Sequence, residues 1–339
     1  MAFLRDSLQI HKLASDLGTR IRKDDDPVAA ILKHCEHRIK TMLVGAGDDW
    51  TLTQLLDWIA NRLSTSFEVI RSDKDLYGIK EKYIQQKETA FVQLEDEFSH
   101  EVFGVTFKLH HSESWEHQYV SVIDCRDHKA ARGYFTKWHE LAHLLTQTDQ
   151  MRLIFRRTHA STNSADPEER LMEVIAGTFG FYQPIVRNFI KGDISFEAIE
   201  SLRQQLCPEA SWQSSLINFS KRWNSPCILV RAEMGLKRSE ETKLNQNRFD
   251  FMVSPETALR AIHVTANDLA RDLGLLIHEN MRIPQTSVIH RAFTEESSYE
   301  ADEDLSSWET SRGGSLKPCH VRVQAKWWLD GVDALIIPT

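Results

Sequence analysis

The 339-residue chain lacks several features that would assign it to a broad class at once. No apolar run approaches the length of a transmembrane helix, which argues against a membrane-spanning protein. The five cysteines are odd in number and scattered, with no C-x-x-C pair, so we expect reduced thiols in the cytoplasm and no cysteine metal site. The first seven residues lack a basic stretch followed by an apolar core, so no signal peptide is expected.

An excess of positive charge is also missing. Lys and Arg number 41 against 49 Asp and Glu, which gives a net charge of −8. Such a chain is not a general nucleic-acid binder, although a local basic patch is compatible with this balance. With 41% hydrophobic and 27% charged residues the composition is that of an ordinary globular protein, long enough for two or three domains.

The strongest chemical signal is the segment T-K-W-H-E-L-A-H-L-L at residues 136–145, which contains H-E-x-x-H. On a helix, His139 and His143 lie one turn apart on the same face, where two imidazoles can bind one metal ion. Glu140 can take a proton from a water molecule and pass it to a leaving amine, as peptide hydrolysis requires. The alternative is an ordinary core helix with two histidines on its polar face.

A hydrolytic metal site needs a third protein ligand, and the next cluster downstream offers one. Asp166 and Pro167 are typical of an N-cap and a first helical residue, so they predict a helix. Glu169 falls at the third position, where a carboxylate usually serves the cap. Glu173 lies one turn deeper among apolar residues and needs a partner, which a metal ion would supply.

These motifs together resemble the ImmA/IrrE-type metallopeptidase family. Its pattern is R-F-T-x-x-H-E-x-x-H-x-L, then E-x-x-A-N-x-F-A and a proline. Here the chain has R-G-Y-F-T-K-W-H-E-L-A-H-L-L, then E-V-I-A-G-T-F-G and Pro184. The match covers residues 50 to 185 approximately and is specific at the two motifs. It implies a gluzincin-like protease in which His139, His143 and Glu173 bind the metal and Glu140 is the general base.

The family resemblance carries further expectations and some departures. The strand expected at residues 119–124 resembles the family's edge strand before the active-site helix. Ala142 stands where the family usually has Gly, Trp138 replaces a small residue, and A-N-x-F-A reads A-G-T-F-G, which affects the details of a substrate groove. Asp149 is a rival third ligand that ranks behind Glu173, because the pattern that would use it expects Gly at position 146 and finds Thr.

An oxyanion donor is also required. Tyr134 and His159 are the two candidates, and the sequence does not choose between them. His159, beside two arginines, is also a weaker candidate for the third ligand, and an exposed loop histidine is the simpler interpretation.

The fold class expected is α+β. Residues 1–47 predict an N-terminal helical arm, and residues 48–185 a zincin-like metallopeptidase domain of helices and a small sheet. Residues 186–236 predict two short helices that resemble a helix-turn-helix. Their basic residues are few for phosphate binding, so any nucleic-acid contact would be weak or indirect, and a helical spacer is the alternative.

Residues 248–339 predict a small α/β domain that resembles a GAF-like sensor domain in order and size alone. Within it, a helix is expected from Ser254 to Gly274. Strands are expected at residues 286–293, 319–328 and 332–337, with an acidic loop at 294–312 that includes a short helix at 302–308.

The sequence therefore predicts a cytoplasmic metal-dependent endopeptidase with a regulatory role in transcription or stress response. Zinc suits two histidines and a glutamate, and manganese is the other candidate. The resemblance implies a protein substrate such as a helix-turn-helix transcription repressor. The alternative is a transcription regulator or sensor that keeps a metal site for structural purposes.

Overall fold

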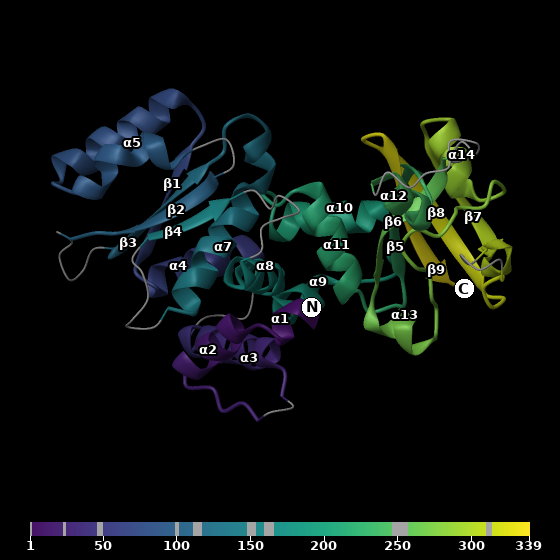
Figure 1. Ribbon diagram of the computed structural model, residues 1–339, viewed down its shortest axis with the longest axis horizontal. Helices are drawn as coiled ribbons and strands as arrows, with labels where there is room; N and C mark the ends of the chain where they lie inside the picture. The colour runs from purple at the N-terminus through teal and green to yellow at the C-terminus, as the bar shows by residue number, and fades with distance from the viewer. Residues whose placement is uncertain are drawn as a thin grey trace. The chain divides into compact units, whose positions relative to one another are not determined.

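The computed structural model describes residues 2–22, 25–45, 50–98, 102–110, 117–147, 154–158, 166–245, 257–309 and 314–339. The fold is mixed α+β, as expected, with a four-stranded and a five-stranded sheet (Figure 1). Within these ranges no helix is both long enough and apolar enough to cross a membrane. The chain divides into two compact units, Met1–Val186 with Gln204–Ser211, and Arg187–Arg203 with Trp212–Thr339.

The first unit contains the sheet that supports the H-E-x-x-H helix. Its strands are β1 (Thr65–Ile70), β2 (Val102–Lys108), β3 (Tyr119–Asp124) and β4 (Ile154–Thr158). They lie in the order β1-β3-β2-β4, with β1 and β3 parallel and the other pairs antiparallel. The interpretation of residues 119–124 as an edge strand is wrong, because β3 pairs on both sides and the edges are β1 and β4.

Two different layers cover the two faces of this sheet (Figure 1). On one face, Val105, Phe107, Val120 and Val122 join an apolar core with α5 (Asp73–Gln85), η1 (Thr89–Gln93) and α6 (Leu94–Glu97). On the other face, α7 (Gly133–Leu145) packs against β2 and β3. The alternation of residues along each strand decides which side chains meet α7.

Helices surround α7 in the same unit. The N-terminal helices α1 (Ala2–Arg5), α2 (Leu8–Asp16) and α3 (Pro27–Met42) contact α8 (Pro167–Phe179), and α8 in turn packs along α7. α4 (Leu52–Arg62) contacts both β1 and α7, and a full capping box between Thr51 and Gln54 fixes its start. Residues 1–47, expected as a separate arm, thus belong to the same compact unit as the first sheet and α7.

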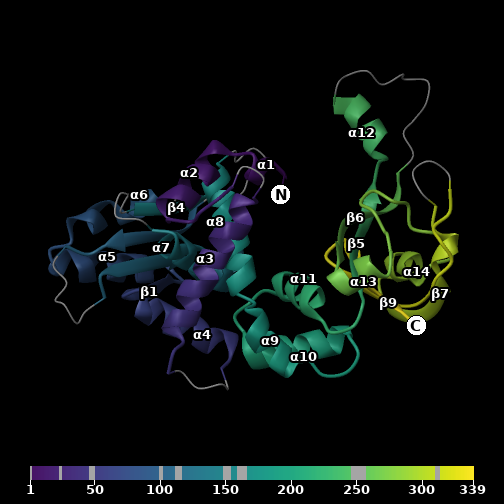
Figure 2. The same cartoon turned by 90° about the horizontal axis from the view of Figure 1, so that it is seen from below.

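The second unit is built on an antiparallel sheet of β5 (Ile228–Gly235), β6 (Ala258–Ala266), β7 (Ser298–Asp304), β8 (His320–Trp328) and β9 (Gly331–Pro338). These strands lie in the order β6-β5-β9-β8-β7. α9 (Gln183–Phe189) and α10 (Phe196–Leu206) cross the division between the units, and α11 (Trp212–Arg222) packs on β5 and β6. α14 (Val288–Thr294) lies on β7, β8 and β9 (Figure 2). The remaining elements of this unit are α12 (Arg238–Asn245), α13 (Asp268–Asp272) and η3 (Leu305–Ser307).

Three local predictions in this unit are wrong. In the described part of the helix expected from 254 to 274, residues 257 onward form strand β6 followed by α13. The β-branched residues Ile262, Val264 and Thr265 favour a strand, and Asn267 caps the helix that begins only after it. The strand expected at 286–293 is α14, which Ser287 caps and which buries Ile289 and Ala292. The acidic loop expected from residue 294 contains β7, an edge strand with an exposed face.

Candidate metal centre

α7 places the two histidines as the motif predicts. His139 and His143 lie one turn apart, and both are buried, at 1% and 5% exposure. The flanking apolar residues Trp138, Leu141, Ala142, Leu144 and Leu145 are also buried, so the helix is enclosed on nearly every side. Burial of two imidazoles side by side is costly unless a shared partner satisfies their ring nitrogens.

The ring nitrogens converge on a carboxylate from α8. His139 Nε2 and His143 Nε2 lie 3.2 Å apart, and the Glu169 carboxylate lies 3.0 Å from the first and 3.5 Å from the second. A tetrahedral ion with bonds of about 2.0–2.1 Å holds its ligand atoms about 3.3 Å apart. The two imidazole nitrogens match this spacing, while the two Glu169 distances belong to different oxygens, Oε2 for His139 and Oε1 for His143. Within the described residues the three side chains form a group whose ligand atoms lie within 4.8 Å of one another, close enough to hold one metal ion.

The start of α8 explains why Glu169 is available to the histidines. Pro167 occupies its first turn, and the Asp166 carboxylate accepts from the backbone N–H of Glu168, so a residue other than Glu169 supplies the N-cap. Glu169 lies on the side of α8 that faces α7 and reaches both imidazoles. The sequence missed this residue because the third helical position is usually read as part of the cap.

Glu173 is half-buried one turn further along α8 and is not part of the three-residue group. The two glutamates are four residues apart and share a helix face. The role of Glu173 as third ligand therefore stays a prediction, and Glu169 is the carboxylate that the structure brings to the histidines.

Glu140, the expected general base, is fully buried beneath the sheet. Its Oε2 accepts a hydrogen bond of 2.8 Å from the Thr106 hydroxyl on β2. It lies next to His139 in the chain but turns toward the sheet, while the histidines turn toward α8. The motif thus places the two candidate ligands and the carboxylate within little more than one turn of one helix.

Contacts at the C-terminal end of α7 fix its last turn. The Thr146 hydroxyl donates to the Ala142 carbonyl at 2.9 Å, and Arg38 on α3 donates to the carbonyls of Leu144 and Leu145 at 3.3 and 2.5 Å. The Ala142 and Leu144 carbonyls also accept from the backbone N–H groups of Thr146 and Gln147, so side chains and backbone together satisfy the carbonyls of the last turn. The N-terminal helices thereby help to hold the turn that carries His143.

An ionic network holds the segment before α7. The Asp124 carboxylate at the end of β3 accepts from the Arg126 guanidinium and from the Lys129 ammonium at 2.8 Å, and Lys129 also donates to the Val102 carbonyl. Arg126 also bonds Asp73 at 2.6 Å. Burial alone would raise the pKa of Asp124, but the bonds from Arg126 and Lys129 outweigh it and lower the pKa.

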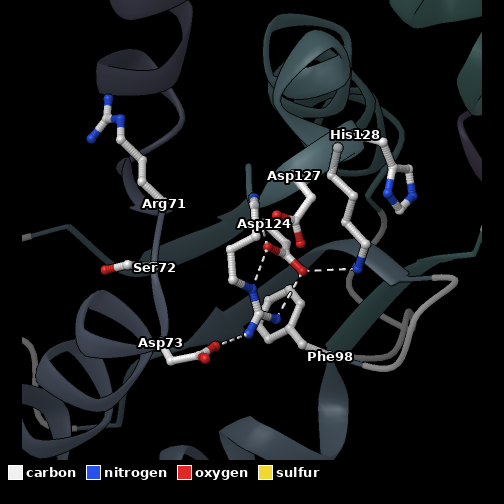
Figure 3. A pocket seen from close by; sticks show the side chains of 9 residues that line it. Arg71, Ser72, Asp73, Phe98, Asp124, Asp127 and His128 are labelled. Carbon is white, nitrogen blue, oxygen red and sulfur yellow. Dashed lines mark hydrogen bonds and ion pairs between the residues drawn. The ribbon is translucent and has the colours of Figure 1, made fainter.

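These residues line a cavity of about 470 Å³ at the carboxyl ends of β1 and β3, and the dashed lines in Figure 3 mark the bonds. Its lining carries charges of both signs that are largely paired with one another. We infer that the network holds η2 (Asp127–Arg132) in place, and η2 leads directly into α7.

The remaining predicted site residues lie apart from the ligand group or outside the described residues. Tyr134 is buried, and its hydroxyl donates to the Gly180 carbonyl at 2.6 Å; burial raises its pKa well above the ordinary value. Its role as oxyanion donor stays a prediction. His159, the other candidate donor, and Asp149, the rival ligand, lie outside the described residues.

The helices expected to resemble a helix-turn-helix are present as α10 and α11. Arg222 of α11 donates to the backbone and side chain of Asn218 on the same helix, and burial lowers its pKa to about 10. The guanidinium of Arg222 therefore makes these hydrogen bonds within its own helix.

Comparison with known proteins gives no assignment: no family model matches the chain, and no curated protein matches it.

Proposed function

We propose that the chain is a metal-dependent peptidase of the ImmA/IrrE type. The observation that carries the proposal is that His139 and His143 of α7, the helix that also carries Glu140, and Glu169 of α8 bring their ligand atoms within 4.8 Å of one another. Two histidines and a carboxylate suit zinc, and manganese is the second candidate. Three protein ligands leave a fourth position for water or substrate, as in catalytic sites.

The chemistry follows from the residues. A divalent ion held there would supply Lewis acidity toward a carbonyl and toward water. Glu140 accepts the proton of the attacking water and delivers it to the leaving amine, because a carboxylate can serve as base and then as acid. His139 and His143 hold the site at fixed spacing through the rigidity of α7, and Glu169 closes it from α8.

The substrate proposed is a protein, and a helix-turn-helix transcription repressor is the specific candidate that the family resemblance suggests. Cleavage of a repressor would give the enzyme a regulatory role. The second unit would then be the part that receives a signal.

The second candidate is a binding protein, such as a transcription regulator or sensor, with a structural metal site. The observation that favours it is the complete burial of Glu140 and its bond to Thr106, which a structural carboxylate would also show. In that case partner or DNA binding would persist in the presence of a chelator, and DNA binding would weaken steeply with salt.

Elemental analysis of the purified protein after zinc loading and desalting tests the metal site. Wild type should retain about one equivalent of zinc, and His143→Ala and Glu169→Ala should retain almost none. Glu168→Ala is the matched control, since Glu168 is the neighbouring acid on α8 outside the group. Glu173→Ala decides between the two carboxylates. Wild type that retains no zinc would exclude this site.

Hydrolysis of fluorescently labelled casein tests the activity. Glu140→Gln should keep the zinc and lose hydrolysis by at least about 100-fold, because general acid–base catalysis contributes that much or more. Zinc-loaded wild type that cleaves neither casein nor a panel of repressor proteins would favour the binding-protein alternative.

A further inference from the structure

The face of the first sheet that meets α7 is small and polar where a core face would be apolar. Thr106 on β2 and Ser121 on β3 lie directly opposite one another in the register, and Gly104 lies two residues before Thr106 on the same side. Their strand neighbours Val105 and Val122 belong to the apolar core on the opposite face. The polar side of both strands is therefore the side that approaches Glu140.

The two hydroxyls and Glu140 form a continuous chain of hydrogen bonds. Thr106 Oγ1 lies 2.8 Å from Glu140 Oε2 and 2.6 Å from Ser121 Oγ, and all three residues are 0% exposed. A threonine hydroxyl has one proton. Since Thr106 donates that proton to the carboxylate, Ser121 must be the donor in the second bond, and its hydroxyl orients that of Thr106.

Gly104 limits the carboxylate from the other side. A Cβ at position 104 would lie 2.9 Å from Glu140 Oε1 and 2.7 Å from Thr136 Cγ2. Only glycine lets β2 approach α7 this closely. The carboxylate of Glu140 thus lies between the Thr106 hydroxyl that it bonds and the backbone of Gly104, where any larger residue would contact it.

We propose that Thr106 is a positioning residue for Glu140, and that Ser121 fixes the direction of the Thr106 hydroxyl. A buried carboxylate needs a hydrogen-bond donor, and a general base must keep one orientation throughout the reaction. The consequence for catalysis rests on the proposed function of Glu140 as general base. The contact itself can be tested without any activity.

A double-mutant cycle in urea tests the contact in the metal-free protein. Thr106→Val replaces the hydroxyl by a methyl of similar shape, and it should lower the unfolding midpoint by about 0.5 M because a buried carboxylate loses the hydrogen bond from Thr106. In the Glu140→Leu background the same change should lower it little or not at all. Thr65→Val is the matched control, because Thr65 is buried on β1 and bonds the Leu63 carbonyl, so its effect should be the same in both backgrounds. Equal effects of Thr106→Val in both backgrounds would overturn the proposal.

Hydrolysis of labelled casein by the zinc-loaded protein tests the positioning role. Thr106→Val should lower kcat by about 10- to 100-fold, with KM and zinc content unchanged, because a misplaced base loses rate and not binding. Thr106→Ser, which keeps the hydroxyl, should restore most of the rate, and Thr65→Val should leave it unchanged. An unaltered kcat for Thr106→Val would refute the positioning role. If wild type itself is inactive, the proposed function fails while the urea cycle still decides the contact.

Discussion

Arg38 and Leu145 are joined across 107 positions of sequence by a hydrogen bond of 2.5 Å from the guanidinium to the carbonyl. The bond links α3 to the last turn of the helix that carries both histidines. It makes the N-terminal helices part of the support for the candidate metal centre.

Replacement of Arg38 by Met should therefore destabilise the end of α7. The apolar stem is kept, while two backbone carbonyls lose a charged donor, which costs about 1.5–3 kcal/mol. Chemical denaturation gives this free energy, and zinc affinity should fall with it because His143 lies in the affected turn.

Lys40→Met is the control for that experiment. Lys40 lies two residues further on α3, is exposed, and pairs only with Glu36 on the surface among the contacts described. Such a pair contributes about 0–1 kcal/mol. A loss as large for Lys40→Met as for Arg38→Met would mean that the effect comes from α3 itself and not from the cap.

The ionic network around Asp124 makes the stability of the first unit depend on acid pH. The pKa of Asp124 is lower in the folded protein than in the unfolded chain, so its contribution is complete above the unfolded value, about 3.9, and is lost as the pH falls through the folded pKa. The urea midpoint measured between pH 7 and pH 3 should fall less in Asp124→Asn than in wild type.

The same variant should be less stable than wild type at neutral pH. Removal of the carboxylate leaves Lys129, which is 5% exposed, without its ionic partner at Asp124, and breaking a buried pair costs about 3–5 kcal/mol. Asp127→Asn is the control, because Asp127 lines the same cavity but is exposed. Indistinguishable pH profiles for wild type and Asp124→Asn would contradict the assignment.

Gly104→Ala should destabilise the protein and displace Glu140. The added Cβ would lie closer than 3 Å to Thr136 and Glu140, and overpacking of this kind costs about 1–3 kcal/mol. Gly78→Ala on α5 should instead stabilise by about 0.5–1 kcal/mol, since no atom lies within 4 Å of its Cβ position and alanine favours a helix. Thermal denaturation distinguishes the two, and opposite signs are the expected result.

The elements around the metal centre could be predicted because their signals are local. Asp166 and Pro167 mark the start of α8, and the apolar periodicity around His139 marks α7; both helices are confirmed. The sequence analysis chose Glu173 over Glu169, but both lie on one face of α8, and the structure brings Glu169 to the histidines. Which glutamate meets the histidines depends on the point along α8 at which it packs against α7. This point is set by the packing of the two helices, and the spacing of residues in the sequence does not predict it.

The contacts of Glu140 could not be predicted from the sequence, for a related reason. Thr106 and Ser121 are ordinary strand residues until the β2–β3 register puts them opposite one another beneath α7. A small-and-polar side on two adjacent strands is a usable signal, but only once the pairing is known. In the second unit, the error at residues 258–266 arose because the apolar residues there fit both the helical repeat and the strand repeat. The segment forms a strand because it pairs with β5 and packs into the core of the second sheet.

The acidic strand β7 has a consequence for how copies of the protein meet. It is an edge of the second sheet, and Glu300 and Asp302 are exposed along it. A second copy that approached this edge to add a strand would bring the same negative charges against them. At neutral pH these charges repel the β7 strand of a second copy. Pairing of two copies through this edge, which is a route to aggregation, is therefore disfavoured.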